Sequence, residues 1–94
     1  MSDPCSAKLK IPNKYGLHAR PATDFATLAA GYTASVRVRT SEEDADGKSV
    51  MELMLLAATK GTEIEVECNG SDAKDCLASL VALVKRGFDE GEDG

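Results

Sequence analysis

Three segments of the chain alternate between apolar and polar residues, as half-buried strands do. They cover about residues 7–12, 34–40 and 62–68, and a short fourth strand fits the sequence around residues 46–48. Because only one face of each segment is apolar, the pattern predicts an antiparallel sheet whose other face lies in water. The residues expected to face inward are Leu9, Ile11, Ala34, Val36, Val38, Ile64, Val66 and Cys68.

The charges on the outward faces of these segments indicate an order for the strands. The first two segments carry Lys or Arg outward, whereas the third carries Glu63, Glu65 and Glu67. Like charges directly opposite one another are unfavourable, and an exposed pair of opposite charges contributes only ~0.2–1 kcal/mol. The segment over residues 62–68 is therefore expected to lie between the other two.

Two longer segments repeat apolar residues with the spacing of an amphipathic helix. The first contains Ala22, Phe25, Ala26 and Ala29, and Gly31 is expected to end it in the left-handed conformation.

The second helix is expected over residues 71–86, with Ser71 as its N-cap. Gly87 and Phe88 fit a Schellman ending, in which a glycine in the left-handed conformation is followed by an apolar residue. The buried stripe is expected to consist of Ala73, Cys76, Leu77, Leu80, Val81 and Val84.

A short helix is expected over about residues 50–58. Ser49 and Glu52 have the spacing of a capping box, in which each side chain bonds to the backbone N–H of the other residue. The helix is apolar almost all round, but a short helix on a sheet buries only one side. The pattern leaves open whether the remaining apolar surface is exposed as a partner site or covered by the neighbouring helices.

These elements predict one α+β domain over residues 1–94, with the order β-α-β-β-α-β-α. The expected architecture is an open-faced sandwich, in which three helices cover one face of a four-stranded antiparallel sheet. The core is expected over about residues 7–88. Residues 1–6 and the acidic segment 89–94 are expected to be frayed ends.

The composition restricts the partners that the domain can bind. The chain of 94 residues carries 11 Lys and Arg against 16 Asp and Glu, a net charge of −5. An acidic chain with two Tyr, two Phe and no Trp lacks the basic surface and stacking aromatics of nucleic-acid-binding proteins. No apolar run approaches the ~18 residues of a membrane span, and the N-terminus has no hydrophobic signal region. We therefore expect a cytoplasmic protein that binds neither nucleic acid nor membrane.

The cysteines argue against two further kinds of site. Cys5, Cys68 and Cys76 are an odd number with no CxxC spacing, which disfavours a disulfide framework and a zinc site. They are expected to be reduced thiols that behave as small hydrophobic residues. With one histidine in the chain, no metal site and no cofactor are expected.

The single histidine lies where a phosphate-binding site can form. His18 precedes the first helix, and Pro21 fits the first turn, where its missing N–H loses no hydrogen bond. The N–H groups of Ala19 and Arg20 are then expected to form an anion site near His18, and the Arg20 guanidinium suits phosphate oxygens. A histidine that merely caps the helix fits the same residues equally well. No P-loop is present, so the chain is not expected to bind and split a nucleotide by itself.

The run GLHARPAT over residues 16–23 resembles the active-site signature of the HPr family of phosphocarriers in the phosphoenolpyruvate-dependent phosphotransferase system. A second run, from Gly47 to Met54, resembles the regulatory-serine motif of that family. The resemblance covers about residues 7–88, with both motifs in the expected order. The family's fold is an open-faced sandwich with the order of elements predicted above.

The resemblance implies a role for each matched residue. His18 would accept a phosphoryl group on Nδ1 from phosphorylated enzyme I and pass it to an EIIA-type domain. The Arg20 guanidinium and the N–H groups of Ala19 and Arg20 would hold the phosphoryl group. The chain would be a stoichiometric phosphoryl carrier rather than an autonomous enzyme, and a monomer suits such a shuttle. The docking residues would be Ala19, Thr23, Thr27, Val50, Met51 and Met54, which favours exposure of the short helix.

The resemblance also identifies Ser49 with the serine that an HPr kinase/phosphorylase modifies in some bacteria. Glu52 stands where many members of the sugar system have Gly, and a phosphate on Ser49 would repel it. The alternative function is a regulatory binding protein that acts through Ser49 phosphorylation and partner docking, although the intact motif around His18 argues against it. Residues 58–67 and 87–90 resemble the nitrogen-regulatory branch, so the output would be sugar uptake or nitrogen and metabolic regulation.

Overall fold

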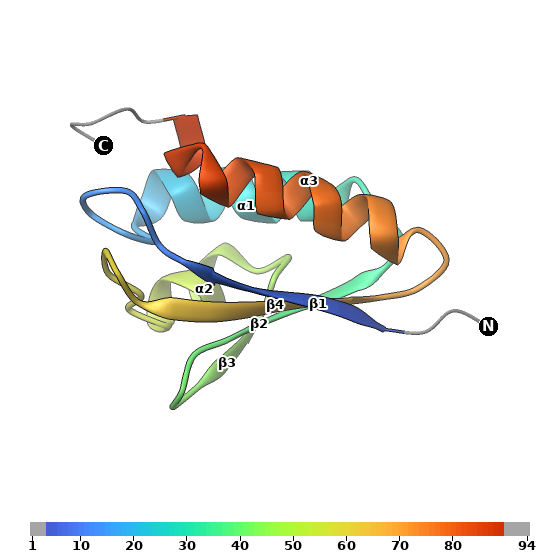
Figure 1. Ribbon diagram of the computed structural model, residues 1–94, viewed down its shortest axis with the longest axis horizontal. Coiled ribbons are helices and arrows are strands. Elements are labelled where there is room, and N and C mark those ends of the chain that lie inside the picture. Colours follow the sequence, from blue (N-terminus) through green and yellow to red (C-terminus); the bar gives the residue numbers. More distant parts are fainter. Residues whose placement is uncertain (1–3, 90–94) are drawn as a thin grey trace.

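The alternating segments form the predicted sheet in the predicted order. The computed structural model describes residues 4–89, and Figure 1 shows the sheet beneath the long helices. β1 (Cys5–Lys10), β2 (Ser35–Arg39), β3 (Asp44–Asp46) and β4 (Glu63–Asn69) are antiparallel and follow the order β1-β4-β2-β3. β4 therefore lies between β1 and β2, as the outward charges predicted.

β1 begins earlier than its alternation predicted. The sequence assigned residues 1–6 to a frayed end, but Cys5 and Ser6 pair with Cys68 and Glu67. This prediction is wrong because β4 continues to Asn69 and offers both residues a partner strand for backbone hydrogen bonds.

Opposite charges meet across the open face of the sheet. Glu65 lies opposite Lys8 of β1 on one side and Arg39 of β2 on the other. The Arg39 guanidinium is 2.8 Å from the carboxylate of Glu67 and 3.7 Å from that of Glu65. Exposed pairs of this kind contribute about 0–1 kcal/mol each, so they favour this strand order while adding little to the stability of the fold.

Three helices pack on the other face of the sheet. α1 (Ala19–Ala30) and α3 (Ala73–Lys85) lie side by side, and the shorter α2 (Val50–Leu55) contacts α1 and β3 (Figure 1). Every strand-region residue that the alternation predicted to face inward is buried. These observations confirm the α+β open-faced sandwich with the order β-α-β-β-α-β-α. The largest fully buried side chains include Phe25, Phe88, Ile11, Leu53, Ile64 and Leu80.

The start of α3 differs from the prediction. Ser71 is exposed, and the N-cap is Asp72. The two carboxylate oxygens of Asp72 accept hydrogen bonds of 2.8 Å from the backbone N–H groups of Thr33 and Ala34. The prediction of Ser71 as the cap is wrong. The contact with the loop after α1 holds the backbone at Asp72, so the helix begins one residue later than predicted.

The ends of the helices were predicted with mixed success. α1 ends at Gly31 with φ −73° and ψ −6°, so the predicted left-handed cap is wrong. α2 ends at Leu55 rather than near residue 58, because Ala57 has a φ of 51° and cannot continue the helix. The end of α3 agrees with the prediction, since Gly87 has a φ of 69° and Phe88 is buried.

The expected frayed C-terminal end lies largely outside the described residues. Asp89 is described and belongs to the short 3-10 turn η1 (Gly87–Asp89). Its carboxylate accepts a 2.9 Å hydrogen bond from Nε of Arg86. Asp89 is therefore part of the folded domain rather than of a solvated tail.

Candidate functional site

The loop before α1 holds the candidate histidine in a fixed turn. Asn13 is buried, and its side-chain amide donates a 2.9 Å hydrogen bond to the backbone oxygen of Gly16. The N–H of Leu17 donates to the backbone oxygen of Ala58 at 2.9 Å, which ties the loop to the segment after α2. Gly16 has a φ of +69°, and a Cβ there would lie 2.1 Å from that Ala58 oxygen. The turn therefore requires glycine at this position.

Sequence reasoning missed Asn13 and Gly16 as supporting residues. The signal available was an Asn followed by a Gly three residues later, a combination that marks turns. The contact with Ala58 could not be predicted from the loop sequence, because it joins two segments that are distant along the chain.

His18 is the N-cap of α1 and is half-buried. Its backbone oxygen accepts the first helical hydrogen bond, from the N–H of Ala22 at 2.9 Å. Its imidazole makes no capping hydrogen bond to the first turn. His18 therefore caps α1 through its backbone oxygen and not through its imidazole.

The start of α1 supplies the predicted anion-binding groups. Ala19 and Arg20 are its first two residues and are exposed, whereas Pro21 is buried. The first N–H groups of a helix have no acceptor within the helix, and the positive end of the helix dipole favours a bound anion. An imidazole, two helix-terminal N–H groups and a guanidinium thus occur on three consecutive residues.

Tyr15 borders this site and was not predicted. Its ring stands edge-on to the ring of His18, with centroids 6.0 Å apart and planes at 86°. The ammonium of Lys14 lies 5.3 Å from the centre of the Tyr15 ring. The Tyr15 side chain is 59% exposed, so it forms one wall of the site on the solvent side.

α2 leaves apolar side chains in water beside the loop that carries His18. Met51 is 75% exposed, Leu55 71% and Met54 43%, whereas Leu53 is fully buried. Exposure of the short helix is therefore confirmed, and Leu55 is a member of the patch that the sequence analysis missed. Val50 is half-buried. Of the other predicted docking residues, Ala19, Thr23 and Thr27 are exposed on α1, which packs against α2.

Ser49 forms only half of the predicted capping box. Its Oγ accepts a 3.2 Å hydrogen bond from the N–H of Glu52. The Glu52 carboxylate accepts from the N–H of Asp46 at 3.0 Å rather than from Ser49. The predicted hydrogen bond from the N–H of Ser49 to the Glu52 carboxylate is therefore absent. The N–H of Ser49 instead donates to the backbone oxygen of Asp46 at 3.0 Å.

The remaining candidate chemistry is sparse in the part of the chain that is described. Between residues 4 and 89, no helix is long and apolar enough to cross a membrane. Within the same range, no group of three or more His, Cys, Asp and Glu residues could hold a metal ion. The three cysteines are free; Cys5 is half-buried, and Cys68 and Cys76 are buried.

Comparison with known proteins agrees with this geometry. The family described as "PTS HPr component phosphorylation site" matches residues 5–86, a range that includes His18, Ser49 and all four strands. The match therefore covers both motifs and the whole fold rather than the histidine loop alone.

Individual relatives cover nearly the same range. Phosphocarrier protein HPr of Pseudomonas aeruginosa is 45% identical over 86 residues, 90% of this chain and 96% of the relative. Phosphocarrier protein NPr of Escherichia coli (strain K12) is 42% identical over 83 residues, 87% of this chain and 92% of the relative. The crystal structure of an HPr from Thermoanaerobacter tengcongensis superposes with a TM-score of 0.88 at 30% identity, covering 92% of this chain and 97% of that one.

Proposed function

Because the chain belongs to the HPr family of phosphocarrier proteins of the phosphotransferase system, we propose that His18 is its phosphoryl acceptor. In this proposal His18 receives the group on Nδ1 from phosphorylated enzyme I and passes it to an EIIA-type domain. The observation that carries the proposal is the placement of His18 at the N-cap of α1, beside the first N–H groups of that helix.

The neighbouring residues fit the needs of phosphoryl transfer. The imidazole nitrogen forms a bond to phosphorus as the bond between phosphorus and the donor breaks, and the reverse occurs at the acceptor. Such reactions depend mainly on positioning and on stabilisation of the negative oxygens. The N–H groups of Ala19 and Arg20 supply donors at the positive end of α1, and the Arg20 guanidinium supplies charge and two-pronged hydrogen bonds.

The docking surface in this proposal combines α1 and α2. Thr23 and Thr27 lie on the exposed side of α1, and Met51, Met54 and Leu55 on the exposed side of α2. The hydrogen bond from Leu17 to Ala58 holds the His18 loop against the end of α2. A partner seated on the apolar side chains of α2 would therefore reach His18.

Ser49 has a structural role that constrains the alternative function. Its hydroxyl caps α2, and the Glu52 carboxylate is engaged at Asp46 beside it. A phosphate on Ser49 would add charge next to Glu52 and the apolar docking surface. Phosphorylation by an HPr kinase would then weaken docking, which makes Ser49 a regulatory residue of the carrier rather than the basis of a separate function.

The direct test is phosphorylation by enzyme I. The chain is incubated with phosphoenolpyruvate, Mg²⁺ and an enzyme I of the sugar or nitrogen type, and weighed intact before and after brief acid treatment. We expect the gain of one phosphoryl group that acid removes, no gain in His18→Ala, and normal gain in Lys8→Ala on the open face of the sheet. Addition of sugar-type or nitrogen-type EIIA then identifies the acceptor by loss of that group.

Two results would contradict the proposal. One is a phosphoryl group on His18→Ala after the same incubation, which would place the acceptor elsewhere. The other is no transfer from either type of enzyme I to a folded chain. In that case an acid-stable phosphate on Ser49 from an HPr kinase would favour the regulatory alternative.

A further inference from the structure

Three cysteines converge at the end of the sheet where β1 begins. Cys5 is the first residue of β1 and lies directly opposite Cys68 of β4. Both belong to the inward-facing set of their strands, because the buried residues Leu9 and Ile64 lie an even number of positions away. Cys76 of α3 lies near the same place, since it contributes to the raised pKa of the Cys68 thiol.

The pairing of Cys5 with Cys68 meets the main geometric requirement of a disulfide. Directly opposite residues of an antiparallel pair have Cα atoms about 4.5–5.5 Å apart, and disulfides need about 4.4–6.8 Å. β1 is an edge strand that pairs only with β4, and Cys5 is its first residue. Cys68 is held on its other side by Val36 of β2, so the small approach of the two Cβ atoms that a disulfide needs falls to Cys5 at the start of the edge strand.

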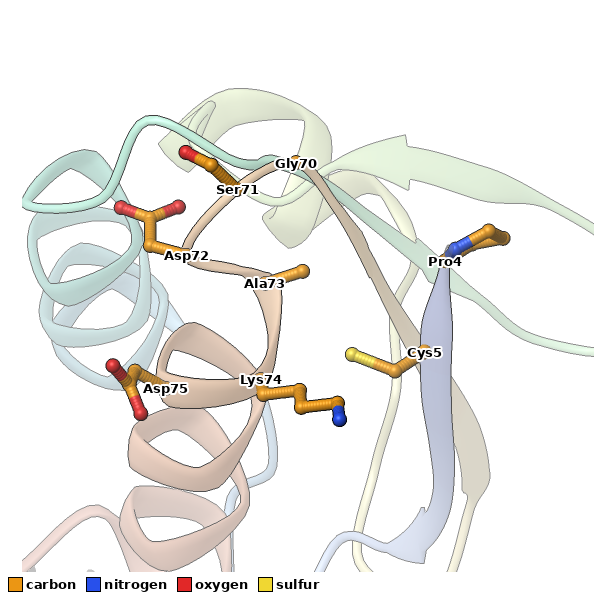
Figure 2. A pocket seen from close by; sticks show the side chains of 8 residues that line it. All are labelled: Pro4, Cys5, Gly70, Ser71, Asp72, Ala73, Lys74 and Asp75. Carbon is orange, nitrogen blue, oxygen red and sulfur yellow. The ribbon is translucent and has the colours of Figure 1, made fainter. Parts of the chain in front are cut away.

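The two thiols differ in their access to a reagent. Cys5 lines a hollow between the start of β1 and the first turn of α3, and Figure 2 shows its sulfur pointing from β1 toward that turn. Lys74 extends into the same hollow, which Asp72 and Asp75 also line. Cys68 is fully buried, and burial raises the pKa of its thiol to about 12. A dissolved disulfide therefore reacts first with Cys5, and the later step at Cys68 is slow.

We propose that Cys5 and Cys68 are a redox pair that forms an intramolecular disulfide, with oxidised glutathione or a similar small disulfide as the oxidant. The Cys5 thiolate first attacks the oxidant, which gives a mixed disulfide at Cys5 and releases one glutathione. The sulfur of Cys68 then attacks the Cys5 sulfur, the bond between the Cys5 sulfur and glutathione breaks, and the proton of Cys68 passes to the departing glutathione thiolate. Two protein thiols are oxidised, and one glutathione disulfide is reduced to two thiols.

The redox pair is remote from the phosphoryl site. β1 runs from Cys5 toward the loop that carries His18, so the two sites lie at opposite ends of the strand. α1 runs over the same distance, and its 12 residues span about 18 Å. The disulfide would therefore fasten the edge strand β1 to the central strand β4 without entering the His18 site.

The test uses the full chain and a readout that is independent of phosphorylation. The folded protein is incubated for hours with excess oxidised glutathione, quenched by acid, weighed intact, and digested without reductant. We expect a product that has lost two hydrogens and in which one linked fragment contains Cys5 and Cys68. The Cys5→Ser variant should not form this linked product, whereas the Cys76→Ala variant should still form it. The melting temperature of the linked form should be about 5 °C or more above that of the reduced chain. Its rate of phosphorylation by enzyme I should stay within about twofold of that of the reduced chain, because the linked residues do not enter the His18 site.

The fragment map of the unaltered chain decides the result even if a cysteine variant fails to fold. A product that stops at one glutathione on Cys5 would overturn the proposal, as would a link between Cys68 and Cys76. Full recovery of three free thiols after the incubation would overturn it as well. None of these outcomes bears on whether His18 accepts a phosphoryl group, so the two proposals fail separately.

Discussion

Gly16 carries no side chain, yet its backbone conformation shapes the loop that carries His18. Its positive φ and its approach to the backbone oxygen of Ala58 bring the His18 loop against the segment after α2. A methyl group at this position must push the two segments apart. The site thus depends on a backbone contact as much as on the imidazole.

Gly16→Ala is expected to lower the free energy of unfolding by about 2–3 kcal/mol or more, through the backbone clash and the strained φ. Gly61→Ala is the matched control, because Gly61 also has a positive φ of +87° but no atom within 4 Å of its Cβ position. It should cost only about 1 kcal/mol. Urea unfolding of both variants measures the difference, and equal losses would show that the Ala58 contact is unimportant.

Tyr15 is expected to orient the His18 ring rather than to react. Tyr15→Leu removes the edge-on aromatic contact, whereas Tyr15→Phe keeps it. In NMR spectra the ring protons of His18 should shift in the Leu variant and stay nearly unchanged in the Phe variant. The rate of phosphorylation should fall a few-fold in Tyr15→Leu only. A Phe variant that behaves like the Leu variant would indicate that the hydroxyl, not the ring, matters.

At this scale the sequence predicted where the candidate groups lie but not the residues that support them. His18, Ala19, Arg20 and Pro21 follow one another, so local rules for helix N-termini place them correctly. Asn13 and Tyr15 act through contacts within the folded loop, which no periodicity reveals.

The short helix α2 presents apolar residues to solvent, and this makes it the element whose surface can be changed with least damage to the fold. Met51→Asp is expected to lower kcat/KM for transfer from enzyme I at least about tenfold, because a charge would enter an apolar interface. Its stability should change by less than about 0.5 kcal/mol, since Met51 is 75% exposed. Ser35→Asp on the open sheet face is the control and should transfer normally. Unchanged transfer by Met51→Asp would place the docking surface elsewhere.

Two serines that precede helices provide a test of the cap assignments. Ser49→Ala should cost about 1 kcal/mol, because Oγ of Ser49 accepts the N–H of Glu52. Ser71→Ala should cost less than about 0.5 kcal/mol, because the cap position of α3 belongs to Asp72. Thermal unfolding of the two variants measures this difference in stability. A larger loss in Ser71→Ala than in Ser49→Ala would indicate that Ser71 caps α3.

The elements themselves were easier to predict than their ends. Alternation identified every long strand, because one buried face leaves a clear period of two. The outward glutamates of β4 also predicted its place between β1 and β2. The prediction failed at the start of α3, where residues of a distant segment, Thr33 and Ala34, make the deciding contact with Asp72.

At the scale of the whole molecule, Asp72 connects two segments that are distant along the chain. Its carboxylate binds the loop between α1 and β2 from the start of α3, and the hydrogen bonds from Thr33 and Ala34 hold its pKa below the usual value. A carboxyl with a lowered folded pKa stabilises the protein above its unfolded pKa, near 3.9. That stabilisation is lost as the pH falls through the folded value.

Asp72→Asn is therefore expected to be less stable than the unaltered chain at neutral pH, with a difference that shrinks as the pH falls below about 4. Chemical unfolding between pH 7 and pH 2 measures this dependence. Asp75→Asn, at an exposed position in the first turn of α3, should show a smaller difference. A loss in Asp72→Asn that is the same at every pH would exclude the charged hydrogen bonds as its cause.

The placement of His18 and the exposed side chains of α2 beside one another has a kinetic consequence. A donor and an acceptor that use the same surface must take turns, so each delivered phosphoryl group requires one partner to leave completely. With association near ~10⁷ M⁻¹s⁻¹, a complex of ~10 µM affinity lasts about 10 ms, whereas one of ~1 nM affinity lasts for minutes. In the proposed function, the rate at which each complex dissociates would then limit the flux, and the few exposed methionine and leucine side chains of α2 would provide a contact small enough to be released quickly.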